Sequence, residues 1–194
     1  MNLTGLTQRE MSELGRSTLI VGLVFTIASR PGTDLVEAAL VFAVSIVAAG
    51  AGFFFHELMH KFTAQRMGYR AEYHMGDFPY VSILFAFAGW IFLSPGAVHI
   101  SAVSRPITRG ANGLISLAGP LTNLMLALAF FGLSFGGPIL HMVGAFGYRI
   151  NIWLAVFNTL PAPTFDGKKI WDWNKALYIG FGVILAGFFL LLRP

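Results

Sequence analysis

The sequence contains no cysteine and few charged residues. None of its 194 residues is Cys, which excludes disulfide bonds, a thiolate metal site and a cysteine nucleophile. Only 11% of the residues are charged, compared with about 25% in ordinary soluble domains. A chain with so little charge cannot cover its surface with ionised groups, so the composition argues against a soluble protein.

Basic runs and nucleic-acid-binding motifs are also missing. The net charge is +4, but the Lys and Arg residues are scattered along the chain. We therefore expect no nucleic-acid partner. In a membrane protein, basic residues more often mark the cytoplasmic side.

Apolar residues are abundant instead. Hydrophobic residues make up 56% of the chain and aromatic residues 14%, which excludes a disordered protein and predicts that the solvent is a lipid bilayer. The sequence shows no internal repeat and no low-complexity linker. We therefore expect one integral-membrane domain over residues 1–194.

Five apolar runs predict transmembrane helices, each of which needs about 20 residues. The first reaches that length only by including Leu14 and letting Arg16 snorkel to the interface. A sixth run, 80–100, is interrupted by Gly89, Pro95 and Gly96. The five runs are 14–29, 35–55, 113–135, 139–160 and 176–192. The expected fold class is an all-α polytopic membrane protein with about five transmembrane helices and a re-entrant or strand-like segment at 80–100.

The strongest motif is His56-Glu57-Leu58-Met59-His60, directly after the run 35–55. Residues four apart share a helix face, so both imidazoles can bind one metal ion while Glu57 acts on a water, as in zinc metalloproteases. With 5 His and 9 acidic residues, chance predicts about 0.006 such matches. Ionisable groups at membrane depth are costly and usually functional. Both arguments disfavour the alternative, two interfacial histidines that merely solvate a helix end.

A catalytic zinc site needs a third protein ligand. The remaining histidines are His74, His99 and His141, and His141 lies far from other polar groups. Asp166 is a better candidate, because it follows an apolar run, lies in a Pro-rich loop and precedes Gly167, which allows a tight turn. The alternative is a turn aspartate that caps the following polar stretch.

Three motifs together resemble the site-2 proteases, a family of intramembrane zinc metalloproteases. They occur in the family's order, and the resemblance covers about residues 35–175, the expected catalytic core. The segments 94–98 and 112–117 look like those of short archaeal members. The motifs are His56–His60 after a long apolar run, Ala118-Gly119-Pro120-Leu121-Thr122-Asn123, which is similar to the family's Gly-x-x-x-Asn element, and Asn158-x-x-Pro161-x-Pro163-x-x-Asp166-Gly167.

The resemblance implies a zinc ion and a division of roles. His56, His60 and Asp166 would bind one Zn²⁺ per chain. Glu57 would be the general base and would then protonate the leaving amine.

The resemblance also implies a role near the metal for two asparagines. Asn158 and Asn123 would hold the substrate or the oxyanion. For Asn123 an interhelical hydrogen bond is an open alternative. Asn151 shares a helix face with Asn158, and we expect it to pack or hydrogen-bond to a neighbour.

A shared zinc site also predicts the topology. If 80–100 crossed the membrane, three crossings would separate His60 from Asp166 and leave them on opposite sides. If 80–100 enters and returns, Asp166 comes back to the histidines. Ten of the thirteen basic residues then lie on one side, which marks that side as cytoplasmic. Arg30, Arg149 and Arg193 remain for the other side. We expect a multi-pass protein of the cell membrane with its active site toward the cytoplasm.

The expected function is zinc-dependent hydrolysis of a peptide bond in or near the transmembrane segment of membrane-anchored protein substrates. One alternative is a non-proteolytic metal-binding membrane protein, such as a carrier, which would usually show polar residues along several spans. The other is a pseudo-protease, against which the intact Glu57 argues. The sequence indicates no oligomeric state and no particular substrate.

Overall fold

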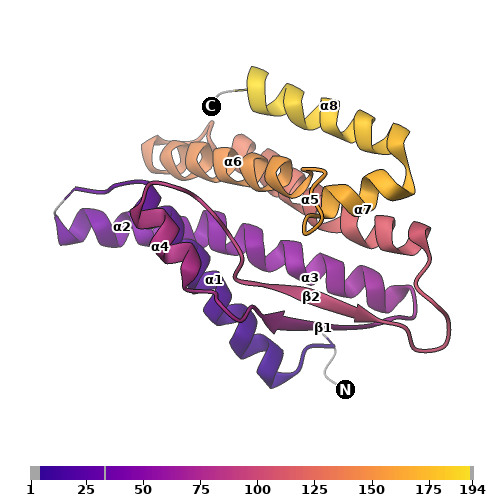
Figure 1. The fold of residues 1–194 in the computed structure, drawn as a ribbon. Coiled ribbons are helices and arrows are strands. Elements are labelled where there is room, and N and C mark those ends of the chain that lie inside the picture. Colours follow the sequence, from indigo (N-terminus) through magenta and orange to yellow (C-terminus); the bar gives the residue numbers. More distant parts are fainter. Residues whose placement is uncertain (1–4, 33, 193–194) are drawn as a thin grey trace.

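The computed structural model describes residues 5–32 and 34–192. Arg193, one of the three basic residues expected on the non-cytoplasmic side, lies outside the described residues. Eight α-helices form most of the fold in the described residues, together with a π-helical turn and two short strands (Figure 1). Four of the helical segments are long and apolar enough to cross a membrane. The protein is therefore an all-α polytopic membrane protein with a small added sheet. The elements are α1 (Gln8–Ala28), α2 (Leu35–Ser45), η1 (Ile46–Gly50), α3 (Ala51–Arg66), β1 (Arg70–Met75), α4 (Val81–Phe87), β2 (Gly96–Ser101), α5 (Arg109–Leu133), α6 (Pro138–Asn158), α7 (Asp166–Trp173) and α8 (Lys175–Leu191).

The first helix begins earlier than its apolar run. Thr7 caps α1, because its side chain accepts from the Glu10 backbone N–H while the Glu10 side chain accepts from the Thr7 N–H. This reciprocal capping box starts the helix at Gln8. The cap gives α1 21 residues, enough to span a membrane. The first turns of the helix are polar, so hydropathy alone did not include them in the expected span.

The metal-binding motif belongs to one long helical segment. Leu35–Arg66 has 32 residues, and the π-helical turn η1 lies between α2 and α3. Asp34 caps its start by accepting from the Val36 N–H. The segment ends before Gly68, whose φ of +82° suits glycine and turns the chain toward β1.

The segment after α3 leaves the metal end of the bundle and returns to it. Strands β1 and β2 pair antiparallel, and Met75 lies opposite Gly96. The residues between them, including α4, therefore depart and come back at one place, and they make no full crossing. The expected excursion at 80–100 is confirmed, with strand structure over Gly96–Ser101 and a short helix that the sequence did not predict.

The remaining helices run back and forth beside α3. In Figure 1, α3 ends, α5 begins, and α7 passes into α8 at the same end of the bundle. α3 packs on α5, α5 on α6, and α6 on α8. Four of the five expected spans meet the length of a crossing helix; the fifth forms α8, which is apolar but has 17 residues.

A buried ion pair fastens α1 to α3 beside the metal-binding motif. Lys61 donates to the Glu10 carboxylate and to the Ala71 carbonyl oxygen, and both charged residues are buried, at 1% and 3% exposure. Glu10 also accepts from the Tyr73 N–H at 3.0 Å. The outer edge of β1 is therefore covered by side chains of α1.

Candidate metal centre

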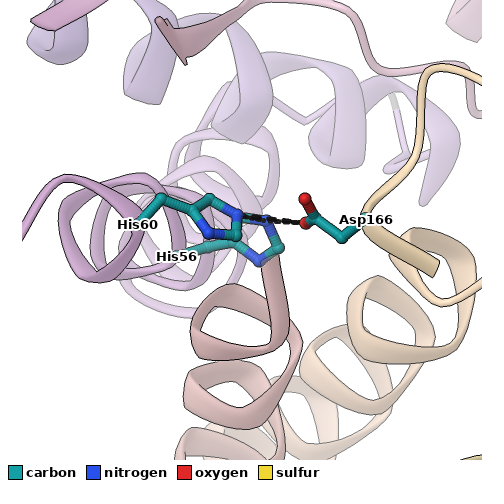
Figure 2. Close-up of side chains that lie close together, drawn as sticks. All are labelled: His56, His60 and Asp166. Atoms are coloured by element: carbon teal, nitrogen blue, oxygen red, sulfur yellow. Dashed lines mark hydrogen bonds and ion pairs between the residues drawn. The ribbon is translucent and has the colours of Figure 1, made fainter. Parts of the chain in front are cut away.

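Three candidate ligands converge although they are distant in sequence. His56 and His60 project from one face of α3, and Asp166 meets them from the start of α7 (Figure 2). His60 Nε2 lies 3.0 Å from His56 Nε2 and 3.0 Å from Asp166 Oδ2. His56 Nε2 lies 3.2 Å from the same oxygen. The topological expectation that Asp166 returns to the histidines is met.

The converging groups are shielded from solvent. His56, His60 and Asp166 are all buried. Burial alone would raise the pKa of the Asp166 carboxyl, but the neighbouring His60 and His56 rings lower that pKa below its ordinary value. Asp166 is therefore an ionised carboxylate, the form that binds a metal ion.

The opposite nitrogen of each imidazole is held by α5. His56 Nδ1 donates to Asn123 Oδ1 at 2.6 Å. His60 Nδ1 donates to the Ile115 carbonyl oxygen at 2.8 Å. Because both acceptors hold a proton on Nδ1, both Nε2 lone pairs face the shared centre, as in metal-binding histidines generally.

Gly119 lets α5 approach these rings. A Cβ at this position would stand 2.5 Å from His60 Nε2 and 2.6 Å from His56 Cε1. Only a glycine leaves that space, because real Cβ contacts are longer. The cradle formed by His56, His60, Asp166 and Gly119 therefore has room beside the ligand atoms.

This donor set fits zinc. Two neutral imidazoles and one carboxylate are a common protein ligand set of catalytic zinc. Neighbouring ligand atoms of a tetrahedral zinc ion lie about 3.3 Å apart, given bonds of about 2.0–2.1 Å. The separations of 3.0–3.2 Å among His56, His60 and Asp166 are close to that value. These three are the metal-ligand group found among the described residues.

Comparisons with known proteins support the same metal. A protein of Methanocaldococcus jannaschii, named as a candidate zinc metalloprotease, is 38% identical over 198 residues, which cover 98% of this chain and 97% of the relative. A protein of Bacillus subtilis with the same description is 31% identical over 142 residues, covering 61% of this chain and 63% of the relative. The chain belongs to this zinc metalloprotease family. No protein-family model and no solved structure match it.

Within this zinc metalloprotease, Glu57 lies beside the ligands and is held by strand β2. Glu57 Oε2 accepts from the Val98 backbone N–H at 3.1 Å, and its side chain is buried. Val98 lies on β2, so the strand edge fixes the carboxylate next to His56 and His60. This contact has no sequence signal, because it depends on a backbone N–H brought back by the excursion.

A cleft opens from the ligands toward the paired strands β1 and β2. Its volume is about 680 Å³, and its lining includes Glu57, Asn158, His99 and Lys169. The Asn158 side chain donates to the Leu154 carbonyl oxygen at 3.0 Å and so lies along the end of α6. Asn158 therefore lines the same cleft as the candidate base.

Asn123 is placed differently from Asn158. Its oxygen accepts from His56, and its Nδ2 donates to the Gly52 carbonyl oxygen at 3.1 Å. These bonds join α5 to α3 behind the histidine, which is the interhelical arrangement left open as an alternative. Its exposed fraction is 0%.

Gly167 serves close packing rather than a special backbone angle. A Cβ there would collide with the carbonyl oxygen of Thr159, so the start of α7 can lie against the end of α6 only with glycine at this position. Its φ is not among the positive values found in the described chain. The sequence pointed to the right residue, but the reason is proximity to α6.

Proposed function

We propose that this protein is an intramembrane zinc metalloprotease of the site-2 type. It would hydrolyse a peptide bond in or near the transmembrane segment of membrane-anchored protein substrates. The observation that carries the proposal is the convergence of His56, His60 and Asp166 on one centre. The two histidines and Glu57 belong to a helical segment that is itself long and apolar enough to cross the membrane.

The proposed chemistry assigns one task to each side chain. His56, His60 and Asp166 hold the zinc ion, which supplies Lewis acidity that makes a water nucleophilic near neutral pH. Glu57 takes a proton from the attacking water and then delivers it to the nitrogen of the breaking C–N bond. Asn158 donates its amide N–H to the substrate or the oxyanion from the cleft wall. Asn123 holds His56 from behind.

The proposed substrate is an unwound stretch of a membrane-spanning segment. A helix hides its own amide groups, so a peptide bond can be attacked only where the helix opens and its backbone finds other polar partners. The cleft has such groups, since its lining includes Ser94, Ser116 and Asn158.

The proposed location is the cell membrane, with the zinc toward the cytoplasm. Most of the basic residues lie near the helix ends on the same side as the metal site, including Arg66, Arg109 and Lys169. Such an excess favours the cytoplasmic side. We also propose that residues 1–194 form one catalytic domain.

The test is cleavage by purified, zinc-loaded protein mixed with a set of single-span substrates. Glu57→Gln should retain zinc but lose about 10²–10⁴-fold in cleavage rate, because it removes the general base. Glu72→Gln is the matched control, since Glu72 lies on the exposed face of β1 away from the ligands, and it should cleave at the wild-type rate. Equal cleavage by wild type and Glu57→Gln, or no cleavage by wild type with zinc bound, would contradict the proposal and favour a metal carrier or a pseudo-protease.

A further inference from the structure

A chain of buried amides leads away from the metal ligand His56. His56 Nδ1 bonds to Asn123 Oδ1 at 2.6 Å, and Asn123 Nδ2 bonds to Asn151 Oδ1 at 3.2 Å. Asn151 Nδ2 in turn bonds to the Ala48 carbonyl oxygen at 3.1 Å. Asn123 and Asn151 are fully buried, at 0% exposure. Three helical segments are therefore joined through two side chains.

The direction of each bond is set by groups that can only accept. Asn151 Nδ2 faces two backbone carbonyls, those of Ala48 and Gly147. An amide NH₂ can donate to both, whereas an amide oxygen could bond to neither. Asn151 Oδ1 must then point at Asn123.

The same logic passes on to the histidine. Asn123 Nδ2 faces two acceptors, Asn151 Oδ1 and the Gly52 carbonyl oxygen. Its own oxygen must therefore face His56, where it accepts a proton from Nδ1. A reversed Asn123 amide would present a donor to Nδ1 and shift the imidazole proton to Nε2, which is the nitrogen that faces the zinc site.

One of the two carbonyl acceptors of Asn151 comes from an unusual part of a helix. Ala48 lies in the π-helical turn η1, directly before α3, the helix that carries the metal-binding motif. Single π-helical turns within α-helices are frequent at functional sites. Here the turn presents a carbonyl oxygen to Asn151 from the same helical segment that carries His56.

Gly52 brings that segment close to the two amides. A Cβ at Gly52 would stand 2.5 Å from Asn151 Oδ1 and 3.3 Å from Asn123 Nδ2. The glycine therefore leaves just enough room for the amide pair between α3, α5 and α6.

We propose that Asn151 is a positioning residue for the metal centre: through Asn123 it fixes the protonation pattern and orientation of His56, so that Nε2 remains available to zinc. Asn151 touches neither the ligand atoms nor the cleft. This inference rests on the metal site of the proposed function, but it goes beyond the residues that family resemblance assigns.

The experiment is a double-mutant cycle with zinc affinity as its readout. Asn123→Leu, Asn151→Leu and the double variant are purified, and the zinc Kd is measured by competition with a chromophoric chelator. Leucine has the same branching and the same number of heavy atoms as asparagine but can neither donate nor accept a hydrogen bond. We expect Asn123→Leu to raise the Kd about 10–100-fold and Asn151→Leu to raise it at least about threefold. The double variant should bind no more weakly than Asn123→Leu alone, because Asn151 acts through Asn123.

A spectroscopic readout separates positioning from general damage. The ligand-field absorption of the Co²⁺-substituted protein reports the arrangement of the bound atoms, and it should shift in Asn151→Leu. Ser134→Ala is the control, because it too removes a buried side-chain donor to a backbone carbonyl, here the Ser134 hydroxyl bonded to Phe131 at the far end of α5. It should leave the Kd and the Co²⁺ spectrum unchanged.

A second variant keeps the test decisive if Asn151→Leu does not fold. Gly52→Ala removes no hydrogen-bonding group but displaces the amide pair, and it should raise the zinc Kd and shift the Co²⁺ spectrum. Gly132→Ala, where an added Cβ meets nothing within 4 Å, is its control.

Two results would overturn the inference. One is an unchanged Kd and spectrum in the folded Asn151→Leu or Gly52→Ala protein. The other is an additive loss in the double variant, which would mean that Asn151 acts independently of Asn123. Neither result depends on cleavage, so a failure of the protease proposal is recognised separately, by wild-type protein that binds zinc without hydrolysing peptides.

Discussion

Gly119 lies against the imidazole of His60, with space for no side chain between them. An added Cβ would stand 2.5 Å from His60 Nε2 and would also contact the His56 ring. The glycine of the Gly-x-x-x-Asn element therefore protects the volume in which zinc is bound, and Asn123, one turn further along α5, holds His56 from behind.

Replacing this glycine should abolish zinc binding. Gly119→Ala places a methyl group at the ligand nitrogens, so we expect loss of bound zinc and of peptidase activity while the helices remain folded. Metal content of the purified protein, measured by mass spectrometry, checks this. Gly132→Ala on the same helix faces open space and should bind one zinc per chain. Full zinc occupancy in Gly119→Ala would show that α5 does not approach the histidines so closely.

Removing the carboxylate ligand should weaken zinc binding more than any change behind the histidines. Asp166→Ala leaves only His56 and His60, so the zinc Kd should rise beyond the roughly 10–100-fold that loss of an outer hydrogen-bond partner costs. Asp172→Ala is the matched control, because Asp172 lies on the same short helix but pairs with Lys168 at the surface. Equal affinities for the two variants would remove Asp166 from the ligand set.

The buried pair of Glu10 and Lys61 should matter for stability. Lys61→Met leaves the Glu10 carboxylate buried without its cation, and breaking such a pair by removing one partner costs about 3–5 kcal/mol. The double variant Glu10→Leu/Lys61→Met, which buries no charge, should recover much of that loss. Thermal unfolding in detergent measures both. If Lys61→Met melts at the wild-type temperature, the pair contributes little to the docking of α1.

The absence of cysteine allows a direct test of topology. Single cysteines at Arg105, Asp172 and Phe135 should label with a membrane-impermeant maleimide from two different sides. Positions 105 and 172 should react from the cytoplasmic side, and position 135, which is 75% exposed at the end of α5, from the opposite side. Labelling of 105 and 135 from the same side would disprove the arrangement of spans.

The metal ligands were accessible to sequence reasoning because they obey simple geometric constraints. His56 and His60 are four residues apart on a helix, and a shared metal ion required Asp166 to return to the same end. That constraint also excluded a full crossing at 80–100. The excursion from Met75 to Gly96 is the structural form of this requirement.

Other features depend on contacts between distant segments and had no local signal. Glu10 and Lys61 are buried charged residues on two different helices, and each charge is neutralised by the other. The start of α1 was placed too late because hydropathy does not register the Thr7 capping box. The role of Asn151 is set by two carbonyl oxygens, one of them in a π-helical turn, and no spacing rule predicts that geometry.

The separation of 106 positions between His60 and Asp166 has a consequence for biogenesis. When α3 leaves the ribosome, the growing chain has two zinc ligands and no third. The third arrives only after α5 and α6 have been inserted and the chain has returned across the bilayer. The ligand set is therefore completed late in synthesis, with the rest of α7 and α8 still to follow, and a partly made chain that ends before Asp166 lacks a complete metal centre.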